Sequence, residues 1–253
     1  CTVRTRPFST FLSRLIWVCM TPLLILAVWL SWSNVRQLEA QHLREGAEIA
    51  RNFADSIDQH LRARMSGLNM LATSPLVDDP SRWQELYDQA LTYQKGFGIH
   101  VIFADHDRQM LFNTRVPFGN ALPRLPDSKG RTAAVEALRT GTPQVGDVVI
   151  GPVAKAPLVA IAVPVRRDGQ PAGLMLSLFE TDRFLQRINQ VALPDGWSLA
   201  LRDSTGTDIA KRAPPDFNGE RDVEPDHRFA VNLATSRWSV VLEIPRSSHG
   251  ANQ

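Results

Sequence analysis

The chain has 253 residues, with 28 lysines and arginines against 26 aspartates and glutamates, and a formal net charge of +2. Charge this close to balance predicts no basic face, so we expect no nucleic-acid partner. Both cysteines, Cys1 and Cys19, lie near the N-terminus, so the remainder of the chain folds without a disulfide.

The first element is an apolar stretch from Leu15 to Trp32, which contains 18 residues and no charge. That length is near the lower limit for crossing a hydrocarbon core, and Trp29 and Trp32 suit a membrane interface. Residues 1–14 carry positive charges only. We therefore predict a cytoplasmic segment at 1–14 and a lipid-facing transmembrane helix at 15–33 in a bacterial inner membrane, with the bulk of the chain outside. A cleaved signal peptide and a buried helix are the alternatives.

The next segment, residues 34–74, predicts one long stalk helix ending near residue 72. Its apolar residues recur at helical spacing and no proline interrupts them before Pro75. The spacing is close to a heptad, so we expect a homodimer through this helix. Packing of its distal half on the chain's own core is the alternative. The apolar residues are Ala50, Phe53, Ile57, Leu61, Leu68 and Leu71.

Residues 75–191 predict a module that mixes helices with an antiparallel sheet. Alternating apolar residues on both sides of the turn "ADHDRQ" predict a hairpin, and "RRDGQP" predicts a second tight turn because Asp-Gly favours one. Gly141 and Pro143 predict the end of a helix. We expect helices over 81–93, 129–139 and 180–191, a hairpin over 99–112, and strands over 145–150, 158–165 and 173–179.

Residues 192–246 predict a smaller module of two strand pairs, in "GWSLALRDSTGTDIAKR" and "HRFAVNLATSRWSVVLEIP", followed by a tail at 247–253. Strands joined as hairpins, with helices between them, favour an α+β fold rather than a parallel α/β one.

This layout behind one membrane helix resembles the double Cache sensor region of bacterial receptors. The strings "FNTRVPFGNALP", "VGDVVIGPVAKAPLVAIAVPVRRDGQPAGLMLSL" and "LPDGWSLALRDSTGTDIAKR" resemble the periplasmic sensor half of HWE-type membrane histidine kinases. The resemblance covers residues 35–245. It implies a PAS-like, membrane-distal Cache module at 75–191, a membrane-proximal module at 192–246, and a small-molecule ligand sensed outside the membrane.

The resemblance does not decide which signalling domain the sensor region controls. The chain shows no phosphoacceptor histidine box, kinase ATP-binding motif or cyclase motif, and "EIPRSSHGANQ" stands where such receptors cross the membrane again. We expect a fragment or a truncated gene of a sensor kinase, and whether the whole protein is an enzyme stays open. The alternatives are the sensor of a diguanylate cyclase or chemoreceptor, or an anchored protein-interaction domain without a small ligand.

The hairpin exit "FNTRVPFG" gathers residues suited to binding a small anion. Asn113 and Thr114 offer hydrogen bonds, Arg115 offers a planar fork that matches a carboxylate, and Phe118 offers an apolar wall. We expect the anion to lie against the strand near residues 149–153. Further candidates are His100 and Tyr93, which flank the first strand, and Lys155.

Other chemistries have little support. The histidines show no metal-ligand spacing and no G-x-S-x-G occurs, so we predict no catalytic residues, metal or cofactor. Amino-acid-binding Cache domains resemble one another through a set of tyrosine, arginine, tryptophan and aspartate residues. Here the tyrosines are Tyr87 and Tyr93 alone, and no tryptophan lies between Trp83 and Trp197. We therefore do not predict an amino-acid ligand.

Overall fold

A computed structural model describes residues 8–126, 132–215, 217 and 223–245, and within residues 8–40 it describes few side chains. The chain divides into a unit of residues 1–45 and a compact unit of residues 46–253, which holds every described strand. Among the residues searched, no helix is both long and apolar enough to cross a membrane. Most side chains of the predicted span 15–33 lie outside the described residues.

Helix α1 runs without a break from Phe8 to Ala72, where the sequence alone suggested two separate helices. Its predicted end is confirmed, since Ser74 and Pro75 begin a short 3₁₀ turn, η1 (Pro75–Asp78). The whole apolar series from Ala50 to Leu71 is buried within the second unit. These residues therefore pack on the chain's own core, as the alternative to a dimer seam proposed, and the homodimer stays a prediction.

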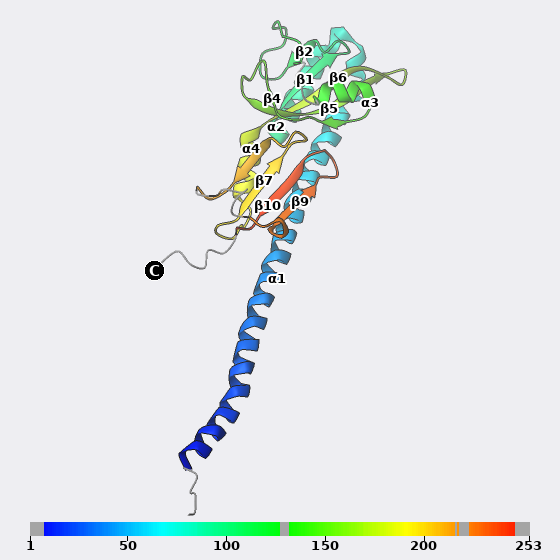
Figure 1. Cartoon of the computed structure of the whole chain (residues 1–253). Helices are drawn as coiled ribbons and strands as arrows, with labels where there is room; N and C mark the ends of the chain where they lie inside the picture. The colour runs from blue at the N-terminus through cyan, green and yellow to red at the C-terminus, as the bar shows by residue number, and fades with distance from the viewer. Residues whose placement is uncertain (1–7, 127–131, 216, 218–222, 246–253) are drawn as a thin grey trace, which may run out of the picture. The chain divides into compact units, whose positions relative to one another are not determined.

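The larger sheet has six antiparallel strands in the order β2-β1-β6-β5-β3, with β4 also paired to β5 (Figure 1). The β5–β6 hairpin turns at Asp168 and Gly169, whose positive φ values of 48° and 79° confirm the predicted Asp-Gly turn. Its strands are β1 (His100–Asp105), β2 (Met110–Asn113), β3 (Gln144–Val145), β4 (Val149–Ile150), β5 (Pro157–Arg167) and β6 (Gln170–Glu180).

The predicted strand 145–150 is broken into β3 and β4, which is a correction to the sequence-based expectation. The break falls at Gly146, where an added Cβ would lie 2.7 Å from the Ala133 backbone nitrogen. Helix α3 (Ala133–Thr140) therefore lies too close for a continuous strand with side chains there. Residues 127–131, part of the predicted helix 129–139, lie outside the described residues.

Helices cover both faces of the larger sheet. On one face, α2 (Trp83–Phe97) contacts the sheet through Trp83, whose ring meets Phe103 edge-on at 5.5 Å, and through Tyr93 beside Ser177. On the same face α1 contacts the sheet through His60, whose ring centroid lies 6.0 Å from that of Phe179. On the other face, the alanines of α3 pack against Ala160, Ala162, Leu174 and Leu176. The odd-numbered residues of β6 thus face α1 and α2, and the even-numbered ones face α3.

The smaller sheet has four antiparallel strands in the order β8-β7-β10-β9. It contacts α1 closely: a Cβ on Gly46 would lie 2.9 Å from Ile244 Cδ1, and the Asp58 carboxylate accepts the amides of Ala234 and Thr235 at 2.8 Å each. The remaining elements of this region are α4 (Thr181–Asn189), β7 (Ser198–Arg202), β8 (Asp208–Arg212), β9 (Arg228–Asn232), β10 (Ser239–Glu243) and the 3₁₀ turn η3 (Pro225–His227). The 3₁₀ turn η2 (Pro80–Arg82) directly precedes α2.

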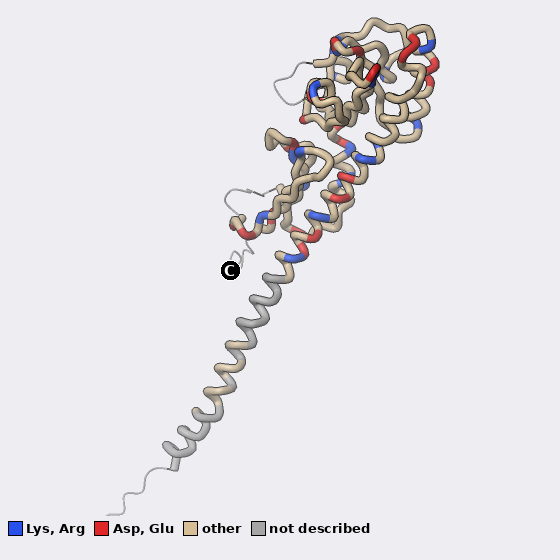
Figure 2. The backbone as a smooth tube through the Cα atoms, turned by 90° about the vertical axis from the view of Figure 1, so that its right-hand side faces the viewer, with Lys and Arg blue, Asp and Glu red and all other residues tan. Residues whose placement is uncertain are grey.

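Lysines and arginines are interspersed with aspartates and glutamates along the backbone of the second unit (Figure 2). The interior is mostly apolar, and three of its buried carboxylates, those of Asp58, Asp147 and Asp203, accept hydrogen bonds from the protein. Fixed carboxylates of this kind join elements that the sheets alone would leave unconnected.

Candidate functional site

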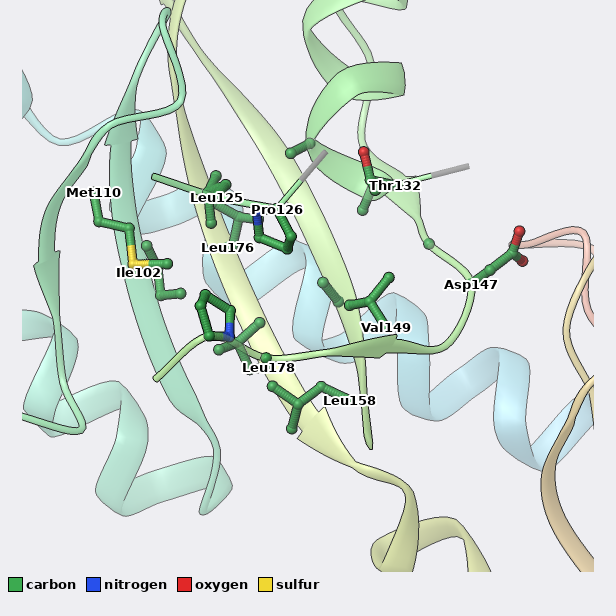
Figure 3. Close-up of a pocket in the computed structure, with 16 residues that line it drawn as sticks. Ile102, Met110, Leu125, Pro126, Thr132, Asp147, Val149, Leu158, Leu176 and Leu178 are labelled. Carbon is green, nitrogen blue, oxygen red and sulfur yellow. The ribbon is translucent and has the colours of Figure 1, made fainter. Parts of the chain in front are cut away.

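A cavity of about 50 Å³ lies between the larger sheet and the layer formed by α3 and its flanking loops (Figure 3). Even-numbered residues of the central strands form its floor because side chains alternate along a strand. The floor residues are Ile102, Leu158, Ala160, Leu176 and Leu178, and Met110 closes one side; the remaining wall comes from Leu125, Pro126, Thr132, Ala133, Ala134, Gly146, Asp147, Val149, Gly151 and Pro152.

Polar groups in the cavity wall form hydrogen bonds within the protein. Thr132 caps α3, and its hydroxyl oxygen accepts the amide of Val135 at 3.3 Å. The Gly146 amide donates to the Ala160 carbonyl at 2.9 Å. The Asp147 carboxylate turns away from the cavity and accepts the amide and the hydroxyl of Ser204 at 2.9 and 2.6 Å (Figure 3).

The broken strand at residues 146–148 joins the cavity wall to the smaller sheet. Trp238 Nε1 donates to the Gly146 carbonyl at 3.1 Å, and the Val148 amide donates to Asp203 Oδ2 at 3.1 Å. Asp203 Oδ1 holds the following turn by accepting the amides of Thr205 and Thr207 at 2.9 and 3.0 Å. With the two Asp147–Ser204 bonds, these contacts form a connection that we call the inter-sheet link.

At the predicted anion site, the Arg115 guanidinium forms an ion pair with Glu180 of the same chain. Arg115 lies 2.7 Å from Glu180 Oε1, and its amide donates to Asn113 Oδ1 at 3.0 Å. Thr114 accepts the Val101 amide at 2.9 Å, so its hydroxyl secures the edge of the sheet. Hydrogen bonding to Arg115 lowers the pKa of Glu180, as expected for a carboxylate that already has a cation.

Three of the other predicted residues lie around this ion pair or on the opposite face. His100 pairs with Leu178 in the sheet, so it lies at the end of the cavity floor, and burial together with Arg115 lowers its pKa. Phe118 packs on Tyr87 at 5.6 Å between ring centroids. Tyr93 is buried on the opposite face, where its hydroxyl donates to the Arg64 carbonyl at 3.1 Å.

Lys155 is exposed in the β4–β5 loop, at a φ of 54°, and does not line the cavity. The structure thus brings Asn113, Thr114, Arg115 and His100 together at the sheet edge and leaves Tyr93 and Lys155 apart from them. Sequence reasoning missed the cavity itself, because its leucines and alanines are indistinguishable from an ordinary core in sequence. The alternation in "GLMLSL" was the available signal, since it gives one face of β6 three leucines.

No model of a known protein family matches the chain. No curated protein matches it in sequence. The similarities are to solved structures.

The chain is similar to the ligand-binding domain of the Campylobacter jejuni chemoreceptor Tlp3, solved with L-valine, at 12% identity over 83% of this chain and 95% of that one, with a TM-score of 0.61. It is similar to the ligand-binding domain of Mlp24, solved with asparagine, at 19% identity over 84% and 96%, also with a TM-score of 0.61. The extracellular domain of rpHK1S-Z16, described as a histidine kinase, gives 14% identity over 83% and 96%, with a TM-score of 0.62.

These similarities establish the fold. The chain is an α+β protein with antiparallel sheets and a long helix, the architecture of ligand-binding sensor domains. The expected fold class is confirmed at that level. Identities below 20% do not carry over a ligand, because function depends on the residues of the site rather than on the fold.

Proposed function

We propose that the chain is the extracytoplasmic ligand-sensing region of a membrane-bound signalling receptor. The observation that carries this proposal is the cavity on the larger sheet, which occurs in a fold shared with ligand-binding domains of receptors. A preformed, mostly apolar cavity is the usual form of a small-molecule site.

The proposal includes an anchor at residues 15–33 in a bacterial inner membrane, with residues 1–14 in the cytoplasm and the second unit outside. Its support is the uncharged stretch and the basic flank. A reporter enzyme that is active only outside the cytoplasm, fused after residue 45, tests this arrangement. We expect an active fusion that stays in the membrane fraction after an alkaline wash; an inactive fusion would contradict the orientation.

The proposed subtype is a double Cache sensor of an HWE-type histidine kinase, supported by the strings within residues 112–212 that resemble such kinases. Chemoreceptors share this fold to a similar degree, so a chemoreceptor output is the second candidate. The homodimer belongs to the proposal too. Since the apolar series from Ala50 to Leu71 packs internally, a dimer would use another surface of α1.

The described contacts offer a route from the cavity to α1. Occupancy would act on the wall at residues 146–148, the inter-sheet link connects that wall to β7 and β10, and Asp58 of α1 holds the β9–β10 turn. A ligand shifts such a system only as far as it binds one arrangement better than the other. In this proposal the residues of the inter-sheet link transmit the change, and two of them, Gly146 and Asp147, also line the cavity.

A thermal-shift screen of the whole chain against a broad metabolite library tests the proposal. Ala160→Leu fills the cavity, and Ala200→Leu adds the same volume to the smaller sheet as a matched control. We expect some compounds to raise the Tm of the wild type and the control but not of Ala160→Leu. If no compound does so, an anchored interaction domain without a small ligand becomes the better account.

A further inference from the structure

Two pairs of basic side chains meet between α1 and α4. His60 and Arg64 lie one turn apart on α1, and Arg183 and Arg187 lie one turn apart on α4. Arg187 Nη2 lies 2.6 Å from His60 Nδ1, and Arg64 Nη1 donates to the His60 carbonyl oxygen at 3.2 Å. Guanidinium groups from both helices therefore contact the same histidine.

Aromatic rings hold the upper part of this cluster in place. The Arg64 guanidinium lies 5.4 Å from the ring centre of Phe97 and 5.8 Å from that of Phe179. Arg183 lies beside the same rings, since a Cβ on Gly98 would be 3.1 Å from its Nη1. A guanidinium that stacks on aromatic rings keeps its charge in a fixed position.

His60 fixes the orientation of Arg187. Arginine has donors only, so His60 Nδ1 accepts the bond and the neutral ring carries its proton on Nε2. Burial, then the three neighbouring arginines, lower the pKa of His60 to about 3, which keeps the ring neutral. His60 is therefore a positioning residue for Arg187.

The three guanidinium groups repel one another. Burial, then Arg187 and Arg183, lower the pKa of Arg64 to about 10. Glu180 is within electrostatic reach of Arg183, but its carboxylate is bonded to Arg115. Like charges at helical spacing destabilise a fold, and an anion placed between them removes that repulsion.

Arg187 also borders an open groove of about 370 Å³ between α1 and the end of α4. The polar side chains of this groove include those of Asn52, Ser56 and Gln190. Hydroxyl and amide groups of this kind bind the neutral, polar part of a ligand. The groove therefore has room for the remainder of a molecule whose anionic group is held by the arginines.

We infer that Arg64, Arg183 and Arg187 bind a doubly charged oxyanion of the phosphate class, either as the free ion or as a monoester. The planar forks of arginine match the oxygens of such an anion, and charge-assisted bonds are stronger than neutral ones. Two negative charges also interact more strongly with three cations than the single charge of a carboxylate does. The site goes beyond the proposed sensing cavity, because it lies on the other face of the larger sheet.

Titration of the whole chain with inorganic phosphate, at constant ionic strength, tests the inference. The probe is the ring signal of His60 in NMR spectra, and the exposed His106 is the internal control. We expect phosphate and sulfate to move the His60 signal with a dissociation constant of about 1 mM or below, and to leave His106 unchanged. Acetate, with a single charge, should need at least about tenfold higher concentration.

Arginine variants locate the site. Arg183 is exposed, so Arg183→Gln removes one charge without disturbing the core. We expect this variant and Arg187→Gln to weaken phosphate binding by at least about tenfold. Arg51→Gln is the matched control, because Arg51 is exposed on α1, roughly 13 Å along the helix from His60 and beyond the Debye length of about 8 Å. It should change the dissociation constant by less than about twofold.

Glycerol phosphate distinguishes the free ion from an ester. A lower dissociation constant for the ester than for inorganic phosphate places its remainder in the groove, and an equal or higher one makes the free ion the ligand; both results support the site. The inference is wrong if phosphate up to about 10 mM leaves His60 unmoved, if acetate binds as tightly, or if Arg51→Gln weakens binding as much as Arg183→Gln. These results leave the sensing proposal untouched, because the Ala160→Leu comparison tests the other face of the sheet.

Discussion

Asp203→Asn should weaken the protein more than an ordinary surface substitution, because Asp203 holds the inter-sheet link and the turn after β7 together. Its carboxylate is buried and accepts four hydrogen bonds, from the Val148 amide, the Thr205 amide and hydroxyl, and the Thr207 amide. Asparagine keeps one acceptor oxygen. If that oxygen serves Thr205 and Thr207, the new amide nitrogen faces the Val148 N–H, and two donors oppose each other.

The magnitude follows from these bonds. A hydrogen bond to a charged group contributes about 1.5–3 kcal/mol, and a neutral one about 0.5–1.5 kcal/mol. One bond is lost and three become neutral, which at these values amounts to roughly 4.5–7.5 kcal/mol. Because bonds that share one carboxylate are not additive, we expect the free energy of unfolding to fall by at least about 3 kcal/mol. That loss is large beside a total of about 5–15 kcal/mol for a typical domain.

Urea denaturation of the whole chain measures this change. Asp78→Asn is the matched control, because Asp78 pairs with Arg167 at 2.7 Å on the surface, with side chains 61% and 50% exposed. An exposed pair contributes about 1 kcal/mol or less. Equal losses for the two variants, at an unchanged m-value, would refute the claim that Asp203 joins the sheets.

Three further predictions concern pH, the ion pair and the cavity wall. Burial, then Arg64 and Arg187, lower the pKa of His60 from 6.5 to about 3. The unfolded chain therefore binds the extra proton first, and the stability that neutral His60 contributes is complete above pH 6.5 and is lost as pH falls toward 3. His60→Gln should flatten this fall in urea titrations at several pH values, and His106→Gln should not. Arg115→Gln should raise the pKa of Glu180, as NMR titration would show, and reduce stability by about 1 kcal/mol or less. It should leave the thermal shifts caused by cavity-binding compounds unchanged; loss of those shifts would contradict our placement of the ligand in the cavity. Gly146→Ala should reduce the free energy of unfolding by about 1–3 kcal/mol because its Cβ meets the Ala133 nitrogen, whereas Gly96→Ala, with open space around it, should not reduce it.

Patterns among neighbouring residues predicted several turns and strands of the larger sheet. The Asp-Gly turn, the hairpin at residues 100–113 and the stop at Gly141, with a φ of 64°, all depend on residues adjacent in the chain. The break at Gly146 does not. It arises from the close approach of α3 and from bonds to Ser204 and Asp203, more than fifty residues away, so no periodicity could reveal it.

The candidate site also depends on contacts between residues that are distant in the chain. Arg115 looks like an anion ligand in sequence because its partner, Glu180, lies 65 positions later and meets it only in the folded sheet. We expected the strand near residues 149–153 to border the anion site at Arg115, and that expectation stays a prediction. Val149, Gly151 and Pro152 line the cavity, which the sequence did not predict. Whether Arg115 and its neighbours bind a ligand stays a prediction.

Amide hydrogen exchange of the whole chain, with and without a saturating concentration of a compound that the thermal-shift screen identifies, tests most directly whether the cavity senses its ligand. Sensing requires that occupancy change the smaller sheet as well as the cavity. We predict slower exchange at the Val148 amide and at the Thr205 and Thr207 amides held by Asp203, with the effect at Thr205 and Thr207 lost in Asp203→Asn. Protection confined to the cavity wall, with no change at Thr205 or Thr207, would contradict transmission through the inter-sheet link.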